Sequence, residues 1–141
     1  MNYILDTCVV SELVKTLPDP KVIAWIDTVD EEKLYLTAIT IGELEKGISK
    51  LPESKRKKKI DQWLHEDMII RFSGRILTLD MNVMLQWGQL TAFLETQGTP
   101  MSTLDSLIAA TALRHQYCLV TRNIRDFRQC GVDLFDPWSG P

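Results

Sequence analysis

The chain has 141 residues and a net charge of −3; 45% of its residues are hydrophobic and 25% are charged, the balance of an ordinary globular protein. No apolar run approaches the roughly 20 residues that a membrane-spanning helix needs, so we expect no such helix. The amino terminus lacks a basic lead and places Asp6 within its apolar run, so we expect no signal peptide, a cytoplasmic location and one domain over residues 1–141.

The hydrophobic pattern alternates between short strands and helices along the whole chain. In chain order, we expect a strand at residues 2–5, helices at 8–14 and 20–29, a strand at 34–37, helices beginning at Thr40 and near Glu53, a strand at 75–79, helices at 81–96 and from Ser102, and strands at 118–121 and 133–135. This alternation predicts an α/β fold with a central parallel β-sheet of four to five short strands, flanked by helices on both faces.

Acidic residues follow several of the predicted strands. Asp6 and Asp80 come directly after strands, Glu43 follows the second strand through the first helical turn, and Asp105 lies in the first turn of a helix that packs on the same sheet. Parallel sheets place functional groups at the carboxyl edge of their strands, where the Thr121-Arg122-Asn123 turn also lies. We therefore expect these groups to gather at one edge.

Each acid also fits a purely structural role. Asp6 and Asp80 are suited to cap the helices that follow them. The patterns Thr40-x-x-Glu43 and Ser102-x-x-Asp105 match the capping box, in which the third residue of the helix bonds back to its cap. Taken one at a time, the acids do not distinguish a helix cap from a functional site.

A cluster of these carboxylates predicts a metal site. Ionised carboxylates at close range repel one another, and a divalent cation relieves that repulsion. Mg²⁺ and Mn²⁺ prefer oxygen ligands, and such ions assist phosphodiester cleavage by activating water and neutralising phosphate charge. The chain has no Ser/His/Asp set, no Walker loop and no GxGxxG motif. The spacing alone predicts a metal-dependent hydrolase or phosphotransferase.

The cysteines and histidines do not form a recognisable site. Cys8, Cys118 and Cys130 include no CxxC pair, so we expect buried thiols. His65 lies in the sequence LHEDM, but no second histidine follows four residues later, as a zinc protease would require. We interpret His65 and His115 as surface or helix-end residues.

The positive charge is concentrated in residues 46–59. This segment carries seven basic residues and one acidic residue, a net charge of +6, and leaves −9 for the rest of the chain. Two interpretations remain open: a solvated helix face, or contact with an acidic partner such as RNA phosphate or an acidic protein tail.

Four segments, in this order, resemble the PIN-domain toxins of bacterial toxin–antitoxin systems, of the VapC and FitB type. They are YILDTCVVSEL (Tyr3–Leu13), TAITIGELEKGI (Thr37–Ile48), STLDSLIAATALRH (Ser102–His115) and LVTRNIRDF (Leu119–Phe127). The LTLD sequence (Leu77–Asp80) and GVDLFDPW (Gly131–Trp138) also look like that family, in which the position of Asp80 is structural. The resemblance spans nearly the whole chain.

The resemblance implies a PIN fold and an endoribonuclease that depends on Mg²⁺ or Mn²⁺. Carried over by position, Asp6 and Asp105 are the principal metal ligands, and Glu43 is a third acid that acts directly or through a bound water. Thr7 and Thr121 resemble hydroxyl-bearing positions that line the pocket.

Two positions depart from the family pattern. Cys8 stands where asparagine is common, and the family's fourth acid is replaced by Asn123, with Asp126 three residues later as a catalytic candidate. Asparagine offers one carbonyl oxygen but no charge. Arg122 and Arg125 flank this turn and either serve solubility or contact substrate phosphate or a bound antitoxin.

The leading hypothesis is a homodimeric RNA-cleaving toxin that forms a higher assembly with its cognate antitoxin and reaches promoter DNA only through it. Its substrate would be tRNA or ribosomal RNA. The alternative is a catalytically weak PIN module that acts mainly as an antitoxin-bound regulatory subunit. A haloacid-dehalogenase-type phosphatase is disfavoured, because that chemistry needs Asp-x-Asp and the sequence reads Asp6-Thr7-Cys8.

Overall fold

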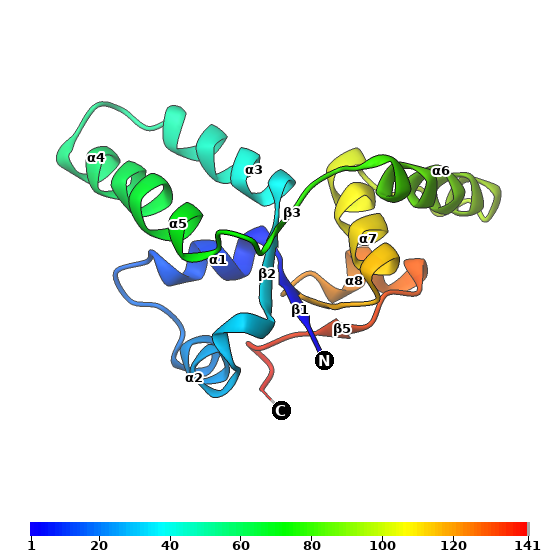
Figure 1. Ribbon diagram of the computed structural model, residues 1–141, viewed down its shortest axis with the longest axis horizontal. Helices are drawn as coiled ribbons and strands as arrows, with labels where there is room; N and C mark the ends of the chain where they lie inside the picture. The colour runs from blue at the N-terminus through cyan, green and yellow to red at the C-terminus, as the bar shows by residue number, and fades with distance from the viewer. Residues whose placement is uncertain (141) are drawn as a thin grey trace.

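A five-stranded parallel sheet forms the centre of the protein in the computed structural model, which describes residues 1–140. The strands are β1 (Tyr3–Leu5), β2 (Leu34–Thr37), β3 (Ile76–Leu77), β4 (Cys118–Val120) and β5 (Leu134–Phe135). They lie in the order β3-β2-β1-β4-β5, and every pair is parallel (Figure 1). The predicted fold class is confirmed.

The order of the strands places β1 between β2 and β4. Tyr3 is in register with Leu34 on one side and with Cys118 on the other. Along the chain, β2 and then β3 are added to the sheet on one side of β1. The later strands β4 and β5 are added on its other side. Open α/β sheets bind their ligands at the carboxyl end of such a switch point. Here it lies between Leu5 and Val120.

Helices connect the strands. The α-helices are α1 (Thr7–Leu13), α2 (Pro20–Thr28), α3 (Ala38–Ser49), α4 (Lys55–Gln62), α5 (Ile69–Arg71), α6 (Met81–Thr96), α7 (Thr103–His115) and α8 (Ile124–Phe127). The 3₁₀ turns η1 (Glu31–Lys33) and η3 (Arg128–Cys130) and the π-helical segment η2 (Trp63–Met68) complete the described chain. Within residues 1–140, no helix combines the length and the apolar character needed to cross a membrane.

Two apolar clusters fill the opposite faces of the sheet. Successive side chains of a strand point to opposite faces. Leu5 and Val120 accordingly pack in one cluster with residues of α1 to α5, whereas Ile4 and Leu119 pack in the other with residues of α6, α7 and α8. Figure 1 shows α3 and α4 on one side of the sheet and α6 and α7 on the other.

Two expected boundaries were wrong. Helix α3 begins at Ala38, because Thr37 is its cap and its hydroxyl oxygen accepts the Thr40 N–H at 3.1 Å. The expected Thr40–Glu43 capping box is therefore absent, and Thr40 lies inside the helix. Strand β3 stops at Leu77, which pairs with Thr37; beyond Thr37 the neighbouring chain turns into α3 and offers no further strand partner.

Candidate active site

Asp6 lies at the switch point of the sheet, between the ends of β1 and β4. Its side chain is buried, and it accepts the Thr7 N–H on Oδ1 at 2.8 Å and the Thr121 hydroxyl on Oδ2 at 2.7 Å. The Asp6 backbone N–H also donates to the Val120 carbonyl at 2.9 Å, which continues the sheet by one bond. The carboxylate is thus fixed from both neighbouring strand ends.

Glu43 comes to this edge on α3 and is held by Thr7 of α1. The Thr7 hydroxyl donates to Glu43 Oε1 at 2.6 Å and lies 3.0 Å from the Thr40 hydroxyl. The Thr40 hydroxyl is in turn 3.4 Å from that of Thr37. This row of hydroxyls joins two segments more than thirty positions apart and keeps the Glu43 carboxylate beside the end of β1.

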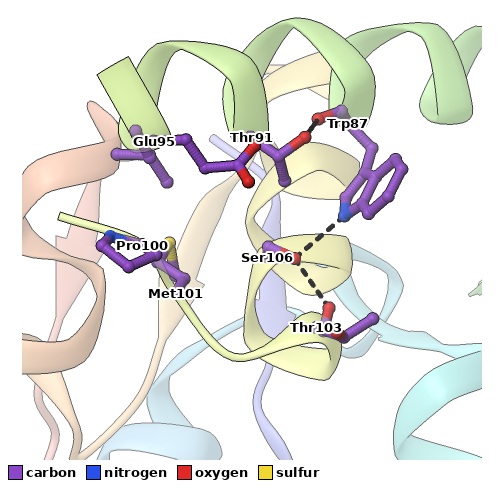
Figure 2. A pocket seen from close by; sticks show the side chains of 8 residues that line it. Trp87, Thr91, Glu95, Pro100, Met101, Thr103 and Ser106 are labelled. Carbon is purple, nitrogen blue, oxygen red and sulfur yellow. Dashed lines mark hydrogen bonds between the residues drawn. The ribbon is translucent and has the colours of Figure 1, made fainter. Parts of the chain in front are cut away.

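Asp105 lies in the first turn of α7, which α6 supports from the side. Figure 2 shows the Trp87 indole N–H donating to the Ser106 hydroxyl, at 2.9 Å, and that hydroxyl donating to the Thr103 carbonyl, at 2.7 Å. A cavity of about 190 Å³ lies beside this contact and is lined by both helices and by the loop that joins them. Ser102 caps α7 and accepts the Asp105 N–H at 3.3 Å. The turn that carries Asp105 is therefore anchored on both sides.

The three acids act on one another electrostatically. Burial raises the pKa of Asp6, hydrogen bonds from Thr121 and Thr7 lower it, and the charges of Asp105 and Glu43 raise it further. Burial also raises the pKa of Asp105, and the charges of Asp126 and Glu43 add to the rise, against a lowering hydrogen bond with Ser102. The charges of Glu43 and Asp105 thus act on Asp6, and the charges of Glu43 and Asp126 act on Asp105.

The turn after β4 contributes less directly. Thr121 is buried and accepts the Asn123 N–H at 3.0 Å, while Asn123 and Asp126 lie exposed at the start of α8. The Arg122 guanidinium lies over the Trp138 ring, 5.1 Å from its centroid. Arg125 is exposed on α8.

Helix α1 carries two further polar side chains that are at least partly buried, Cys8 and Glu12. The sequence singled out Cys8 as a departure from the family pattern, but it assigned no role to Glu12. Cys8 Sγ lies 3.8 Å from Asp6 Oδ2 and 3.7 Å from the Thr121 hydroxyl, and burial, with the Asp6 charge, raises the pKa of this thiol. Glu12 is buried, accepts the Asp19 N–H at 2.8 Å and fixes the loop between α1 and α2. A glutamate on the apolar side of α1 was the only signal in the sequence.

The donor set suits a hard divalent cation. Asp6, Glu43 and Asp105 offer carboxylate oxygens only. The charge of Glu43 raises the pKa of both Asp6 and Asp105, and the charge of Asp105 raises that of Asp6, so a cation would relieve this repulsion. Within residues 1–140, the ligand atoms of these three do not all fall within 4.8 Å of one another. Mg²⁺ keeps several of its waters and usually takes only one or two protein carboxylates, which fits this spacing.

The fold is that of a known family. The PIN domain model matches residues 3–132, and the chain belongs to the PIN domain family. Among its relatives, VapC ribonuclease Y4jK of Sinorhizobium fredii is 38% identical over 136 residues, 96% of this chain and 97% of that protein. Toxin FitB of Neisseria gonorrhoeae is 36% identical over 135 residues, 96% and 97% of the two chains.

A solved structure shows the same architecture. The structure of FitAB bound to an IR36 DNA fragment matches with a TM-score of 0.91 and 34% identity, over 96% of this chain and 95% of that chain. The resemblance to PIN-domain toxins of the VapC and FitB type, inferred from the four sequence segments, is confirmed.

Proposed function

We propose that this protein is a metal-dependent endoribonuclease and the toxin of a toxin–antitoxin pair, acting as a single PIN domain. One observation carries the proposal: Asp6 is fixed at the switch point of the sheet, in the electrostatic field of Asp105 and Glu43. The relatives named VapC ribonuclease and Toxin FitB support the activity and the biological class.

In this proposal the site holds Mg²⁺ or Mn²⁺ through Asp6 and Asp105, with Glu43 as a direct or water-mediated third ligand. The bound ion would supply an activated water and neutralise charge on the scissile phosphate. Thr121 orients Asp6 and Thr7 orients Glu43, so the acids need little rearrangement when the ion binds.

The turn after β4 takes the place of a fourth acid. We assign Asp126 a catalytic role, and the support for it is that its charge raises the pKa of Asp105. Asn123 offers a neutral carbonyl oxygen in the same turn. We assign pocket-lining roles to Thr7, Thr121, Arg122 and Asn123.

This protein has a groove beside Glu43 that could receive a segment of the antitoxin. A cavity of about 190 Å³ opens between α1, α3 and α4, and Thr7 and Glu43 form one end of it. The remaining lining is mostly apolar: Ser11, Val14, Leu44, Gly47, Ile48, Leu51, Ile60 and Trp63. A segment of the antitoxin in this groove would cover Glu43. We propose that promoter DNA is reached only through the antitoxin, in line with the DNA in the FitAB structure.

A homodimer is part of the proposal. Helix α6 leaves large apolar side chains exposed on its outer surface, at Met81, Leu85 and Phe93. This surface lies on the other side of the sheet from the α1–α3–α4 groove (Figure 1), so one chain can bind a second copy and an antitoxin at once. Light scattering after size-exclusion chromatography tests it: Leu85→Asp should convert a dimer to a monomer.

The substrate is proposed to be tRNA or ribosomal RNA in the cytoplasm, selected by shape around single-stranded bases. The test is cleavage of structured RNA by purified protein with Mg²⁺ or Mn²⁺. Asp6→Asn and EDTA should each abolish cleavage, whereas Asp80→Asn should leave it intact, because Asp80 only caps α6 and accepts the Val83 N–H at 2.9 Å. Cleavage that survives both treatments would identify a contaminating nuclease and refute the proposal.

A growth assay distinguishes an RNA-cleaving toxin from a regulatory subunit that does not cleave RNA. Expression without the antitoxin should arrest growth, and Asp105→Ala should relieve the arrest. Arrest that persists with Asp105→Ala would show that cleavage at this site is not the cause.

A further inference from the structure

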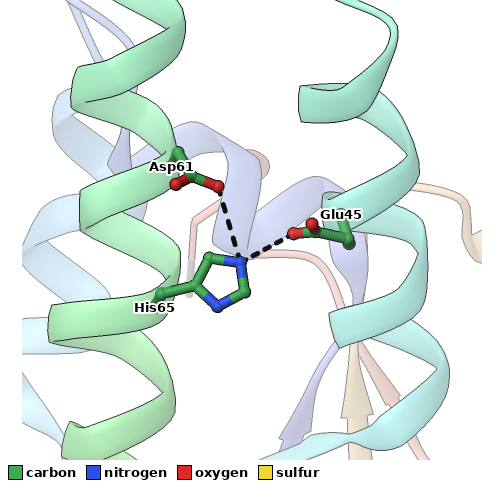
Figure 3. Close-up of side chains that lie close together, drawn as sticks. All are labelled: Glu45, Asp61 and His65. Carbon is green, nitrogen blue, oxygen red and sulfur yellow. Dashed lines mark hydrogen bonds and ion pairs between the residues drawn. The ribbon is translucent and has the colours of Figure 1, made fainter.

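Three side chains of types that can ligate a metal ion meet on the surface of the helices that follow β2, and none of them is among the candidate catalytic acids. Glu45 comes from α3, Asp61 from α4 and His65 from η2. Figure 3 shows both carboxylates pointing at the same ring nitrogen of His65. In the sequence His65 has no second histidine at metal-site spacing; its neighbours in space are two acids instead.

The distances match the edges of a metal coordination shell. The Nε2 atom of His65 lies 2.9 Å from Glu45 Oε2 and 3.5 Å from Asp61 Oδ1, and the three ligand atoms all fall within 4.8 Å of one another. Ligands at 2.0–2.1 Å from a tetrahedral zinc ion are about 3.3 Å apart. Asp61 and His65 share one helix face at an i, i+4 spacing, the separation that zinc sites on helices use.

We propose that Glu45, Asp61 and His65 bind a divalent transition metal of the zinc class, with water in the remaining position. The imidazole nitrogen favours zinc over magnesium, which prefers oxygen donors alone. The three side chains are 45% to 51% exposed, which leaves space for a water ligand and for entry of the ion. This site is separate from the proposed catalytic acids.

A hydrogen bond alone explains this arrangement of the three side chains less well than a bound metal ion does. A neutral imidazole has one N–H, which serves one carboxylate, and here two carboxylates converge on the same nitrogen. An ion pair at this level of exposure contributes little to stability. A cation among the three atoms satisfies all of them at once. It would also tie α3, which carries Glu43, to η2.

The experiment measures metal binding in tag-free, full-length protein carrying Asp6→Asn and Asp105→Asn, which removes two proposed catalytic ligands. Calorimetric titration with Zn²⁺ should give one ion per chain, with Mg²⁺ unable to compete. His65→Ala in this background should weaken binding at least about tenfold. His115→Ala, which removes the other histidine, should leave stoichiometry and affinity unchanged. Co²⁺ should give ligand-field absorption that His65→Ala abolishes.

Two further variants separate ligand loss from misfolding. Glu45→Gln and Asp61→Asn keep the size of each side chain and should each weaken Zn²⁺ binding, without altering the circular dichroism spectrum. Zn²⁺ should raise the Tm of the parent protein and not that of His65→Ala. Equal Zn²⁺ binding by the parent and by His65→Ala would overturn the proposal and leave a surface hydrogen bond only. With the catalytic acids restored, His65→Ala should retain Mg²⁺-dependent RNA cleavage, so the two sites are tested independently.

Discussion

Thr121 and Thr7 act on two different acids in the same way. Each hydroxyl comes from a neighbouring segment and fixes one carboxylate oxygen, at 2.7 Å for Asp6 and 2.6 Å for Glu43. A threonine hydroxyl can donate one bond and still accept another, and Thr121 also accepts the Asn123 N–H. The position of each acid therefore depends on a residue that itself carries no charge.

We expect Thr121→Val to lower the free energy of unfolding by about 1–3 kcal/mol, because buried Asp6 Oδ2 loses its donor and the Asn123 N–H its acceptor. RNA cleavage should fall about 10- to 100-fold, since Asp6 is no longer fixed. Urea unfolding and initial cleavage rates measure the two effects. Thr111→Val is the matched control, because that buried hydroxyl bonds only to the Leu107 carbonyl of its own helix. Equal losses of stability and of cleavage rate in the two variants would contradict the role of Thr121 in fixing Asp6.

The raised pKa of Asp105 has a consequence for stability. A carboxyl whose pKa is higher in the folded state than in the unfolded state favours folding when protonated, and that contribution is lost as the pH rises through the folded-state pKa. In EDTA at pH 7, Asp105→Asn should therefore have a higher Tm than the wild type, and the difference should shrink in acid. Thermal unfolding across pH measures this. Asp80→Asn, which keeps its cap, should show no such gain.

The candidate acids and the pocket positions of Thr7 and Thr121 could be named from the sequence, but the acid that each hydroxyl holds could not. Asp6 directly follows a strand, and strand ends meet at one edge of a parallel sheet. Thr37 and Thr40 both fit as the cap of α3, and local sequence does not decide between them. The bond from Thr7 to Glu43 joins residues on two helices, whose packing the chain order does not give.

At the scale of elements, α6 has a supporting role for the site. Its Trp87 side chain reaches Ser106, the residue after Asp105, and so fixes the first turn of α7. Small buried residues on α7, Ala109 and Ala112, let the apolar side of α6 pack closely against it. Asp105 is thus positioned by a neighbouring helix as well as by its own cap.

A double-mutant cycle tests this support. Trp87→Phe and Ser106→Ala should each lower the free energy of unfolding, and their effects should be coupled by about 1 kcal/mol, because each removes the same hydrogen bond. Urea unfolding of the two single variants and the double variant measures the coupling. Strictly additive effects would show that the indole N–H does not support α7.

Element boundaries followed the sequence where a local signal existed. Helix α6 covers residues 81–96 as expected, because Asp80 caps it and Gly98 and Pro100 follow its end. Strand β3 was overestimated, since its length depends on where its neighbour ends. The contact between Glu45 and His65 could not be predicted from the sequence either, because it depends on how two helices pack.

At the scale of the whole molecule, charge is divided between two regions. The acids of the site lie at the sheet edge, and the basic residues 46–59 extend from the end of α3 into α4. Lys58 and Lys59 are exposed there. Under the proposed function, this positive surface attracts RNA phosphate towards the protein.

Replacing Lys58 and Lys59 with glutamine should raise the KM for RNA several-fold, leave kcat unchanged and reduce the salt dependence of binding, because fewer counterions are released. Steady-state cleavage at two salt concentrations measures these changes. Lys21→Gln with Lys33→Gln removes the same charge elsewhere and should have little effect. If both pairs behave alike, the basic segment is only a solvated surface.

The position of β4 beside β1 also governs when the site can exist. Thr121, which fixes Asp6, lies 115 residues after Asp6 in the chain. Asp105 comes shortly before Thr121. During synthesis, Asp6 and Glu43 leave the ribosome early, whereas Thr121 is made 115 residues after Asp6. A nascent chain that ends before β4 therefore has no complete site. For the proposed RNA-cleaving toxin, this order of assembly would postpone activity until the chain has been synthesised through β4.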